Sequence, residues 1–218
     1  MGWAEFVAAY GMFFLSHSVP VRPPVRGWLQ ARLGPSGFTL AYSVLSLAAL
    51  AWLIGAAGRA PHVVLWHWAP WQAHVPIAVM GPVCLILALS LARPNPFSFG
   101  GARNHLFDPA RPGIVRWSRH PLLLALALWA GAHAVPNGDL AHVILFGTFA
   151  GFALVGGRLI DRRKRREMGE AWQRLQAAVA AAPRLPRRAP LARILAGGAL
   201  YAALIWLHPL VFGVSPLP

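Results

Sequence analysis

The chain has 218 residues, of which 57% are hydrophobic and only 12% are charged. Soluble domains carry about a quarter charged residues, so this composition argues against a soluble globular protein and for a membrane protein. The formal net charge of +14 would suggest nucleic-acid binding in a soluble chain, but we expect no nucleic-acid partner here, because the basic residues lie between long apolar runs without an aromatic–basic platform.

Six segments are long and apolar enough, or nearly so, to cross a bilayer, which takes about 20 mostly apolar residues. The fourth is short, but Pro121 and Pro136 bracket it. The first has Glu5 where a signal peptide would carry basic residues, so we expect a retained helix. The one cysteine, Cys84, lies inside an apolar run and can form no internal disulfide. The six segments are residues 2–19, 38–57, 75–92, 120–136, 140–160 and 191–213.

The links between these segments alternate in charge. The second and fourth links carry only Arg59 and Asp139 as charged residues, whereas the first, third and fifth are strongly basic. Basic links face the cytoplasm, so we expect both termini on the opposite, periplasmic side. The basic residues are Arg22, Arg26 and Arg32 in the first link, Arg93, Arg103, Arg111, Arg116 and Arg119 in the third, and Arg162, Arg163, Lys164, Arg165, Arg166, Arg174, Arg184, Arg187 and Arg188 in the fifth.

The fifth link contains a basic amphipathic segment, residues 161–182. Met168, Trp172, Leu175 and Val179 follow helical spacing there, which predicts a helix on the inner leaflet with its basic residues toward anionic lipid headgroups. The sequence therefore predicts an all-α fold: a polytopic membrane helix bundle of about six transmembrane helices plus a cytoplasmic amphipathic interfacial helix.

Two histidines at membrane depth are candidates for binding, because polar groups are costly there. His17 follows Tyr10, Phe13 and Phe14, and a histidine ringed by aromatic side chains suits a flat apolar cofactor. Simple hydrogen bonding between helices explains it as well. His133 is the second candidate.

His133 lies four residues after Trp129 and four before Asn137, so the three share a helical face. The small residues Gly131 and Ala132 beside it would let a helix or a planar ligand approach closely.

Other polar residues have simpler interpretations. His120 stands at the start of the fourth segment, between Arg119 and Pro121, where interfacial polar residues are common. Asn137, Gly138 and Asp139 suit a tight turn in which Asp139 caps the fifth helix. The sequence shows no zinc spacing and no motif of soluble hydrolases, nucleotide-binding proteins or metalloproteases.

Three stretches resemble the NnrU family of bacterial membrane proteins, which are associated with nitrite and nitric oxide metabolism. They are "FFLSHS" at 13–18, "VVLWHWAPW" at 63–71 and "RHPLLLALALWAGAHAVPNGDLAHVILFG" at 119–147. The resemblance runs from about residue 2 to 175. It implies an NnrU-like domain over residues 1–190, an additional C-terminal helix over 191–218, and a multi-pass protein of the bacterial inner membrane.

The family is in turn similar to the 15-cis-zeta-carotene isomerase of plants and cyanobacteria, in which histidines of two helices are thought to bind haem b. The matching positions here are His17 and His133, with Trp129 and Asn137 beside the cofactor. The isomerase has a cysteine where this chain has Ala130, which removes any thiolate ligand. Depth in the membrane favours His120 as the partner of His17, whereas the resemblance favours His133. We expect His133 to bind iron and His120 to support it, with His120 as the rival ligand.

The sequence leaves three functions open. The first is a haem protein of nitrite or nitric oxide metabolism, or one that isomerises, oxidises or reduces a lipid-soluble substrate. The second is a non-catalytic accessory protein of denitrification. The third is an enzyme like the isoprenylcysteine carboxyl methyltransferases, which share an RHP element and a Gly-x-x-aromatic segment, here Gly169 to Trp172.

Overall fold

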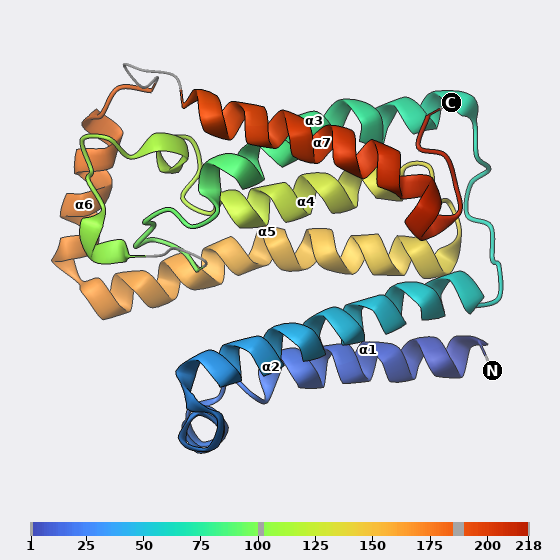
Figure 1. Ribbon diagram of the computed structural model, residues 1–218, viewed down its shortest axis with the longest axis horizontal. Coiled ribbons are helices and arrows are strands. Elements are labelled where there is room, and N and C mark those ends of the chain that lie inside the picture. The colour runs from blue at the N-terminus through green and yellow to red at the C-terminus, as the bar shows by residue number, and fades with distance from the viewer. Residues whose placement is uncertain (1, 100–102, 185–189, 218) are drawn as a thin grey trace. The chain divides into compact units, whose positions relative to one another are not determined.

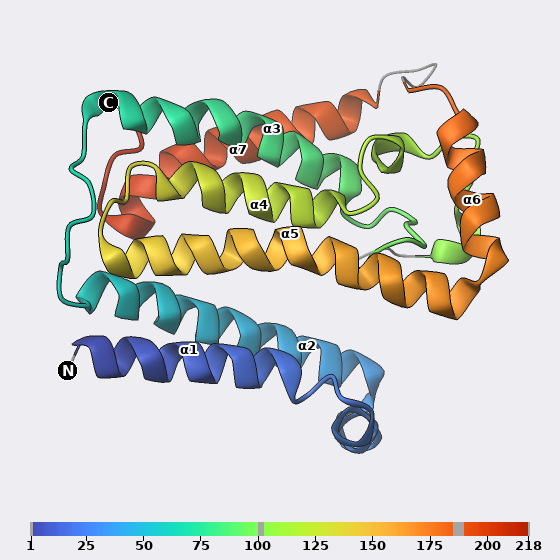
Figure 2. The same ribbon diagram turned by 180° about the vertical axis from the view of Figure 1, so that it is seen from behind.

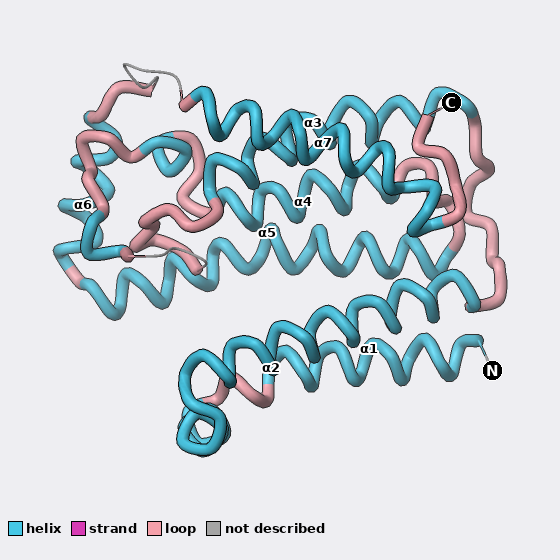
Figure 3. The backbone as a smooth tube through the Cα atoms, in the orientation of Figure 1, coloured by secondary structure: helices cyan, strands magenta, loops and turns pink. Residues whose placement is uncertain are grey.

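The computed structural model describes residues 2–99, 103–184 and 190–217. These residues form seven α-helices, three short 3-10 helices and one isolated β-bridge, and Figure 3 shows only helices and loops in this part of the chain. The all-α prediction is confirmed. The α-helices are α1 (Gly2–Ser18), α2 (Pro23–Arg59), α3 (His74–Ser90), α4 (Pro121–Ala134), α5 (Leu140–Met168), α6 (Glu170–Ala181) and α7 (Leu191–Phe212), and the 3-10 helices are η1 (Pro70–Ala73), η2 (Asn104–Leu106) and η3 (Gly113–Arg116).

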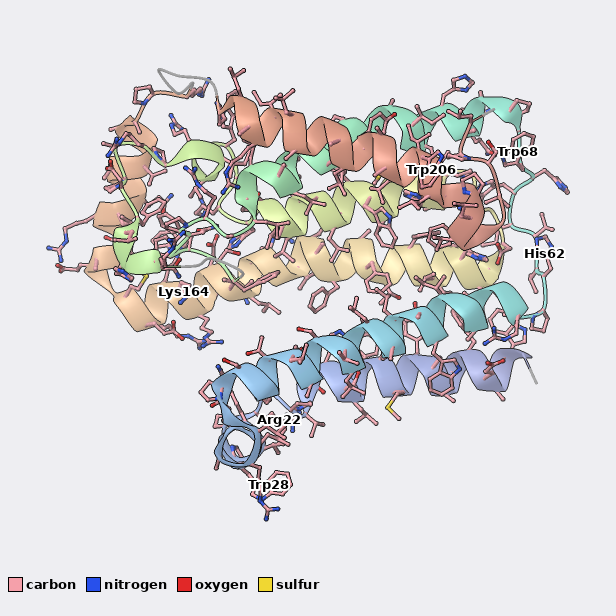
Figure 4. The ribbon with its side chains drawn as sticks, viewed as in Figure 1. Arg22, Trp28, His62, Trp68, Lys164 and Trp206 are labelled. Atoms are coloured by element: carbon pink, nitrogen blue, oxygen red, sulfur yellow. The ribbon has the colours of Figure 1, made fainter. Side chains whose placement is uncertain are left out.

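Four stretches of the described chain are helical, long and apolar enough to cross a membrane: α2, η1 with α3, α5 and α7. The helix α4 is apolar but shorter. Large apolar side chains point outward, among them Leu195 and Trp206 on α7, which are 72% and 70% exposed (Figure 4). Such exposure is costly in water and favourable in lipid, so this is a membrane protein.

The chain forms two compact units, and the first comprises α1, α2 and residues up to Trp66 together with Gly138–Leu145. In it α1 and α2 pack side by side (Figure 1). Phe6, Ala9 and Leu53 are buried there, and a salt bridge of 2.6 Å between Glu5 and Arg59 joins the start of α1 to the end of α2.

Helix α2 is longer than the sequence predicted. It begins at Pro23 rather than near residue 38, because Pro23 and Pro24 start a helix well and nothing stops it before Gly34. Gly34 has a φ of 71° and precedes Pro35, and α2 bends at this point. The first link is therefore mostly helical.

A short backbone pairing joins the second and fourth links within the first unit. The Leu65 amide donates to the Gly138 carbonyl at 2.8 Å, and the Leu140 amide donates to the Val63 carbonyl at 2.9 Å. Two of the three stretches that carry the family resemblance, around Trp66 and around Gly138, therefore lie against each other.

The second unit comprises His67–Asn137 and Phe146–Pro218. In it α3 packs against both α4 and α7 (Figure 2). Gly197 of α7 lies so close to α3 that a Cβ there would be 3.1 Å from the Leu85 Cα. Arg193 donates to the Ala88 carbonyl at 2.6 Å, which satisfies a carbonyl that the end of α3 leaves unpaired.

An end cap closes one end of this unit and consists of α6 and residues 95–117, apart from 100–102, which lie outside the described residues. Its core contains the four apolar residues predicted to share a face. An amphipathic helix is present as α6, but it is shorter than the predicted segment 161–182, because α5 continues to Met168 and the helix is interrupted at Gly169, whose φ is 54°. That face packs against protein. Arg187 and Arg188 lie outside the described residues. The core cluster contains buried Phe97, Val115, Trp172 and Val179, with Phe107, Ile114, Met168 and Leu175 packed against them.

Candidate functional site

His17 lies in the last turn of α1, within the first unit. Its Nδ1 is 2.7 Å from the Phe13 carbonyl oxygen, four residues earlier. The Phe13 ring centroid is 4.1 Å from that of His17, and the Tyr42 ring of α2 is 6.2 Å away. Of the aromatic residues predicted to surround His17, Phe13 lies against its ring, and Tyr42 adds a ring from α2. Tyr42 could not be identified from sequence, because no local pattern shows which residues of α2 face α1.

His133 lies in the last turn of α4, within the second unit. Its Nδ1 is 2.8 Å from the Trp129 carbonyl oxygen. The rings of Trp129 and Phe146 lie 5.4 and 5.7 Å from the His133 ring. Trp129 and His133 share a face of α4, whereas Asn137 lies beyond the end of this helix, contrary to the predicted shared face, and its side chain donates to the His133 carbonyl at 2.7 Å.

His17 and His133 have the same ring nitrogen available for a ligand. A carbonyl oxygen only accepts hydrogen bonds, so Nδ1 of each ring must be the protonated nitrogen. Nε2 of each neutral ring then carries a lone pair, and the described residues provide no hydrogen bond to it. Both side chains are half-buried and lie against aromatic rings. This is the state in which an imidazole binds a metal.

His120 differs, because both of its ring nitrogens are occupied. Nδ1 is 2.9 Å from the Ser98 hydroxyl oxygen, and Nε2 is 3.1 Å from the Asp161 carboxylate. The same carboxylate accepts a hydrogen bond of 2.6 Å from Arg119. We call Ser98, Arg119, His120 and Asp161 the polar junction. Its histidine has no ring nitrogen left to bind iron while these bonds persist.

The polar junction fastens the start of α4 to α5 and to the end cap. Asn95 donates from its side chain to the Arg119 carbonyl at 3.0 Å, and Gly157 leaves room for the His120 ring, 3.1 Å from where a Cβ would be. Ser98 and His120 could exchange a proton in principle. However, Ser98 is only 7% exposed, and Arg119 already neutralises Asp161. The arrangement therefore suits a structural junction better than a hydrolytic site.

Asp139 caps α5, as the sequence predicted. Its carboxylate accepts hydrogen bonds from the His142 amide at 3.2 Å and from the His142 ring at 2.6 Å. Among the residues that the structure describes, no group of three or more His, Cys, Asp or Glu side chains could hold a metal ion.

His17 belongs to the first unit and His133 to the second. Their joint binding of one haem stays a prediction. The division of the chain at residue 190 also stays a prediction, and it lies at the edge of a stretch, 185–189, outside the described residues.

Comparisons with known proteins give one match. A family model described as "NnrU protein" matches residues 5–216, which is nearly the whole chain and includes α7. No curated protein matches the chain, and no solved structure does.

Proposed function

This chain belongs to the NnrU family, as its motifs predicted, and on that premise we propose that it binds haem b in the membrane and acts in nitrite or nitric oxide metabolism. His17 and His133 are the proposed iron ligands. The observation that carries the proposal is their shared arrangement, in which Nδ1 donates to a carbonyl four residues earlier and Nε2 keeps its lone pair.

The residues around each histidine fit this cofactor. A hydrogen bond from Nδ1 fixes the ring and raises the basicity of Nε2 as a ligand, and aromatic rings such as Phe13 and Trp129 suit a flat macrocycle. Haem would supply an iron that binds nitric oxide or passes one electron. The chain would orient the imidazoles and exclude water, while Asn137 holds the end of α4.

His120 is the weaker ligand candidate. It stands at the right depth to accompany His17 if the basic links face the cytoplasm, but Ser98 and Asp161 hold both of its nitrogens. Releasing one of them would leave a buried polar group without a partner, which costs free energy. We therefore keep His133 as the proposed ligand and assign His120 to the polar junction.

Of the two kinds of molecule on which a haem protein of this family could act, we favour nitric oxide over a lipid-soluble substrate. The position at which the isomerase has a cysteine is Ala130, which is fully buried in α4. No thiolate is present there to exchange with a histidine on iron, so isomerase chemistry has less support in this chain.

We further propose that the protein crosses the bacterial inner membrane several times with both termini in the periplasm. The support is the distribution of charge. The first, third and fifth links of the sequence carry most of the basic residues, whereas the links around Trp66 and Gly138 carry few.

The experiment is an absorption spectrum of the purified full chain in detergent, expressed with ample haem. We expect a Soret band that weakens strongly in His17→Ala and His133→Ala and persists in His120→Ala. Size-exclusion profiles confirm that each variant is folded. A band that His120→Ala alone removes would reassign the ligand, and no band in the folded wild type would overturn haem binding.

A second step tests the role of nitric oxide. Nitric oxide added to the reduced, haem-loaded protein should shift the Soret band. A spectrum that stays unchanged would overturn this part of the proposal and leave haem binding intact.

A further inference from the structure

The basic residues at the end of α5 fall into two groups, those that have an interaction partner within the protein and those that do not. Arg163 and Lys164 pair with Glu167 at 2.6 and 3.2 Å, and the Arg165 guanidinium lies 4.4 Å from the centre of the buried Trp172 ring. Figure 4 labels Lys164 in this region, where many side-chain nitrogen atoms gather. These three cations therefore already have partners within the protein.

Three arginines nearby have no such partner. Arg158, Arg162 and Arg166 are exposed and form no salt bridge with any described residue. They are four residues apart, so they follow one row along the surface of α5. Three exposed cations in a row without counter-charges repel one another, and an anion from outside the chain would relieve that repulsion.

The same row becomes apolar toward the middle of α5. Leu154, Val155 and Leu159 are 66%, 50% and 56% exposed, and Leu154 precedes Arg158 by four residues. Helix α5 has 29 residues and is about 43 Å long, whereas the hydrocarbon core is about 30 Å thick. Its C-terminal part must therefore leave the hydrocarbon, and the change from leucine to arginine marks where it does so.

The neighbouring helix α6 does not offer such a surface. Its apolar face packs inside the end cap, and Arg174 is its one cation. The basic surface that the sequence predicted within residues 161–182 therefore lies on α5 rather than on α6.

We propose that this face of α5 binds an anionic phospholipid, with the phosphate on Arg158, Arg162 and Arg166 and an acyl chain along Leu154, Val155 and Leu159. Guanidinium groups bind phosphate oxygens through paired hydrogen bonds, and the inner leaflet supplies anionic lipid at this depth. The proposal goes beyond haem binding and does not depend on it.

Native mass spectrometry of the full chain tests the site. The protein is released from detergent after equilibration with equal amounts of phosphatidylglycerol and phosphatidylcholine of the same acyl chains. We expect wild type to retain phosphatidylglycerol preferentially. Each Arg→Gln change should weaken that preference about fivefold, and R158Q/R162Q/R166Q should abolish it, whereas R158K/R162K/R166K should keep most of it.

Two control variants distinguish lipid binding at a specific site from attraction of lipid by the net positive charge of the protein. R22Q/R103Q/R174Q removes three exposed arginines elsewhere and should keep the preference. L154S/L159S should lower retention of both lipids. Equal loss in the two arginine triples would overturn the site, because net charge alone would then explain binding. Displacement of phosphatidylglycerol by millimolar inorganic phosphate would overturn the lipid as its occupant.

Discussion

Three histidines near helix ends differ in what their ring nitrogens contact, and this difference assigns their roles. His17 and His133 use Nδ1 for a backbone carbonyl of their own helix and leave Nε2 for a ligand. His120 uses both nitrogens for side chains from two other segments. The sequence could place all three residues at helix ends, but it could not supply the partners of His120, because Ser98 and Asp161 are 22 and 41 residues away along the chain.

Asp161→Asn should destabilise the protein, because it removes the charge that Arg119 and His120 share. Asp161 and Arg119 are 13% and 36% exposed in their side chains, so the loss should be about 2 kcal/mol of unfolding free energy. Thermal unfolding in detergent measures it. Asp108→Asn is the matched control, since its pair with Arg111 is exposed and should contribute little to stability. Equal effects of the two changes would contradict a role for the polar junction.

At the scale of elements, the turn between α4 and α5 and the end cap each bring together segments that are distant in the sequence. The turn was readable locally, since Asn137, Gly138 and Asp139 predict a tight turn and a helix cap. The backbone pairing of this turn with residues 63–66 could not be predicted from the sequence, because a single β-bridge leaves no periodic pattern of apolar residues. The apolar face of α6 was likewise predicted, but whether lipid or protein covers such a face cannot be read from its spacing.

Gly138→Ala should disrupt the pairing of the two links. A Cβ at Gly138 would lie 2.2 Å from the Trp66 carbonyl oxygen and 2.6 Å from its indole ring, so backbone must move. We expect a loss of about 2 kcal/mol, measured as a lower melting temperature. Gly147→Ala in α5 meets no atom within 4 Å and should not lower the melting temperature, because alanine favours a helix more than glycine does. A Gly138→Ala variant as stable as wild type would refute the close contact.

Trp172→Ala should loosen α6 from the end cap. Trp172 is 3% exposed and packs edge-on against Phe97, so its truncation should cost about 3 kcal/mol. Limited proteolysis should then cut near Gly169 faster than in wild type. Trp206→Ala, whose side chain is 70% exposed on α7, should not change the cleavage rate, and accelerated cleavage in both variants would argue against a local effect.

For the whole molecule, composition and the apolar segments predicted most of the helices. Four of the six expected segments coincide with a helix to within two residues. Helix α2 begins earlier than expected, at Pro23, and α5 continues to Met168, eight residues beyond the expected end at residue 160. What composition could not predict is the division into two units, since residues 138–145 join the first unit although they follow α4 of the second. Contacts between segments distant in sequence determine that division.

The proposed orientation predicts which links are accessible from outside. In a Cys84→Ser background, a cysteine replacing His62 should react with a membrane-impermeant maleimide in intact spheroplasts. Cysteines replacing Arg103 or Arg174 should react only after the membrane is permeabilised. All three positions are exposed, so burial does not account for a difference. The reverse labelling pattern would place the basic links in the periplasm and contradict the orientation.

The central claim, that Nε2 of His17 and of His133 binds haem iron, is tested most directly by supplying the missing imidazole. Haem-loaded His17→Ala and His133→Ala are titrated with free imidazole, and the Soret band is followed with His120→Ala as the control. We expect imidazole to restore the wild-type spectrum in the first two variants and to leave the control unchanged. Wild-type spectra in the untreated variants, or no response to imidazole in either, would contradict the claim.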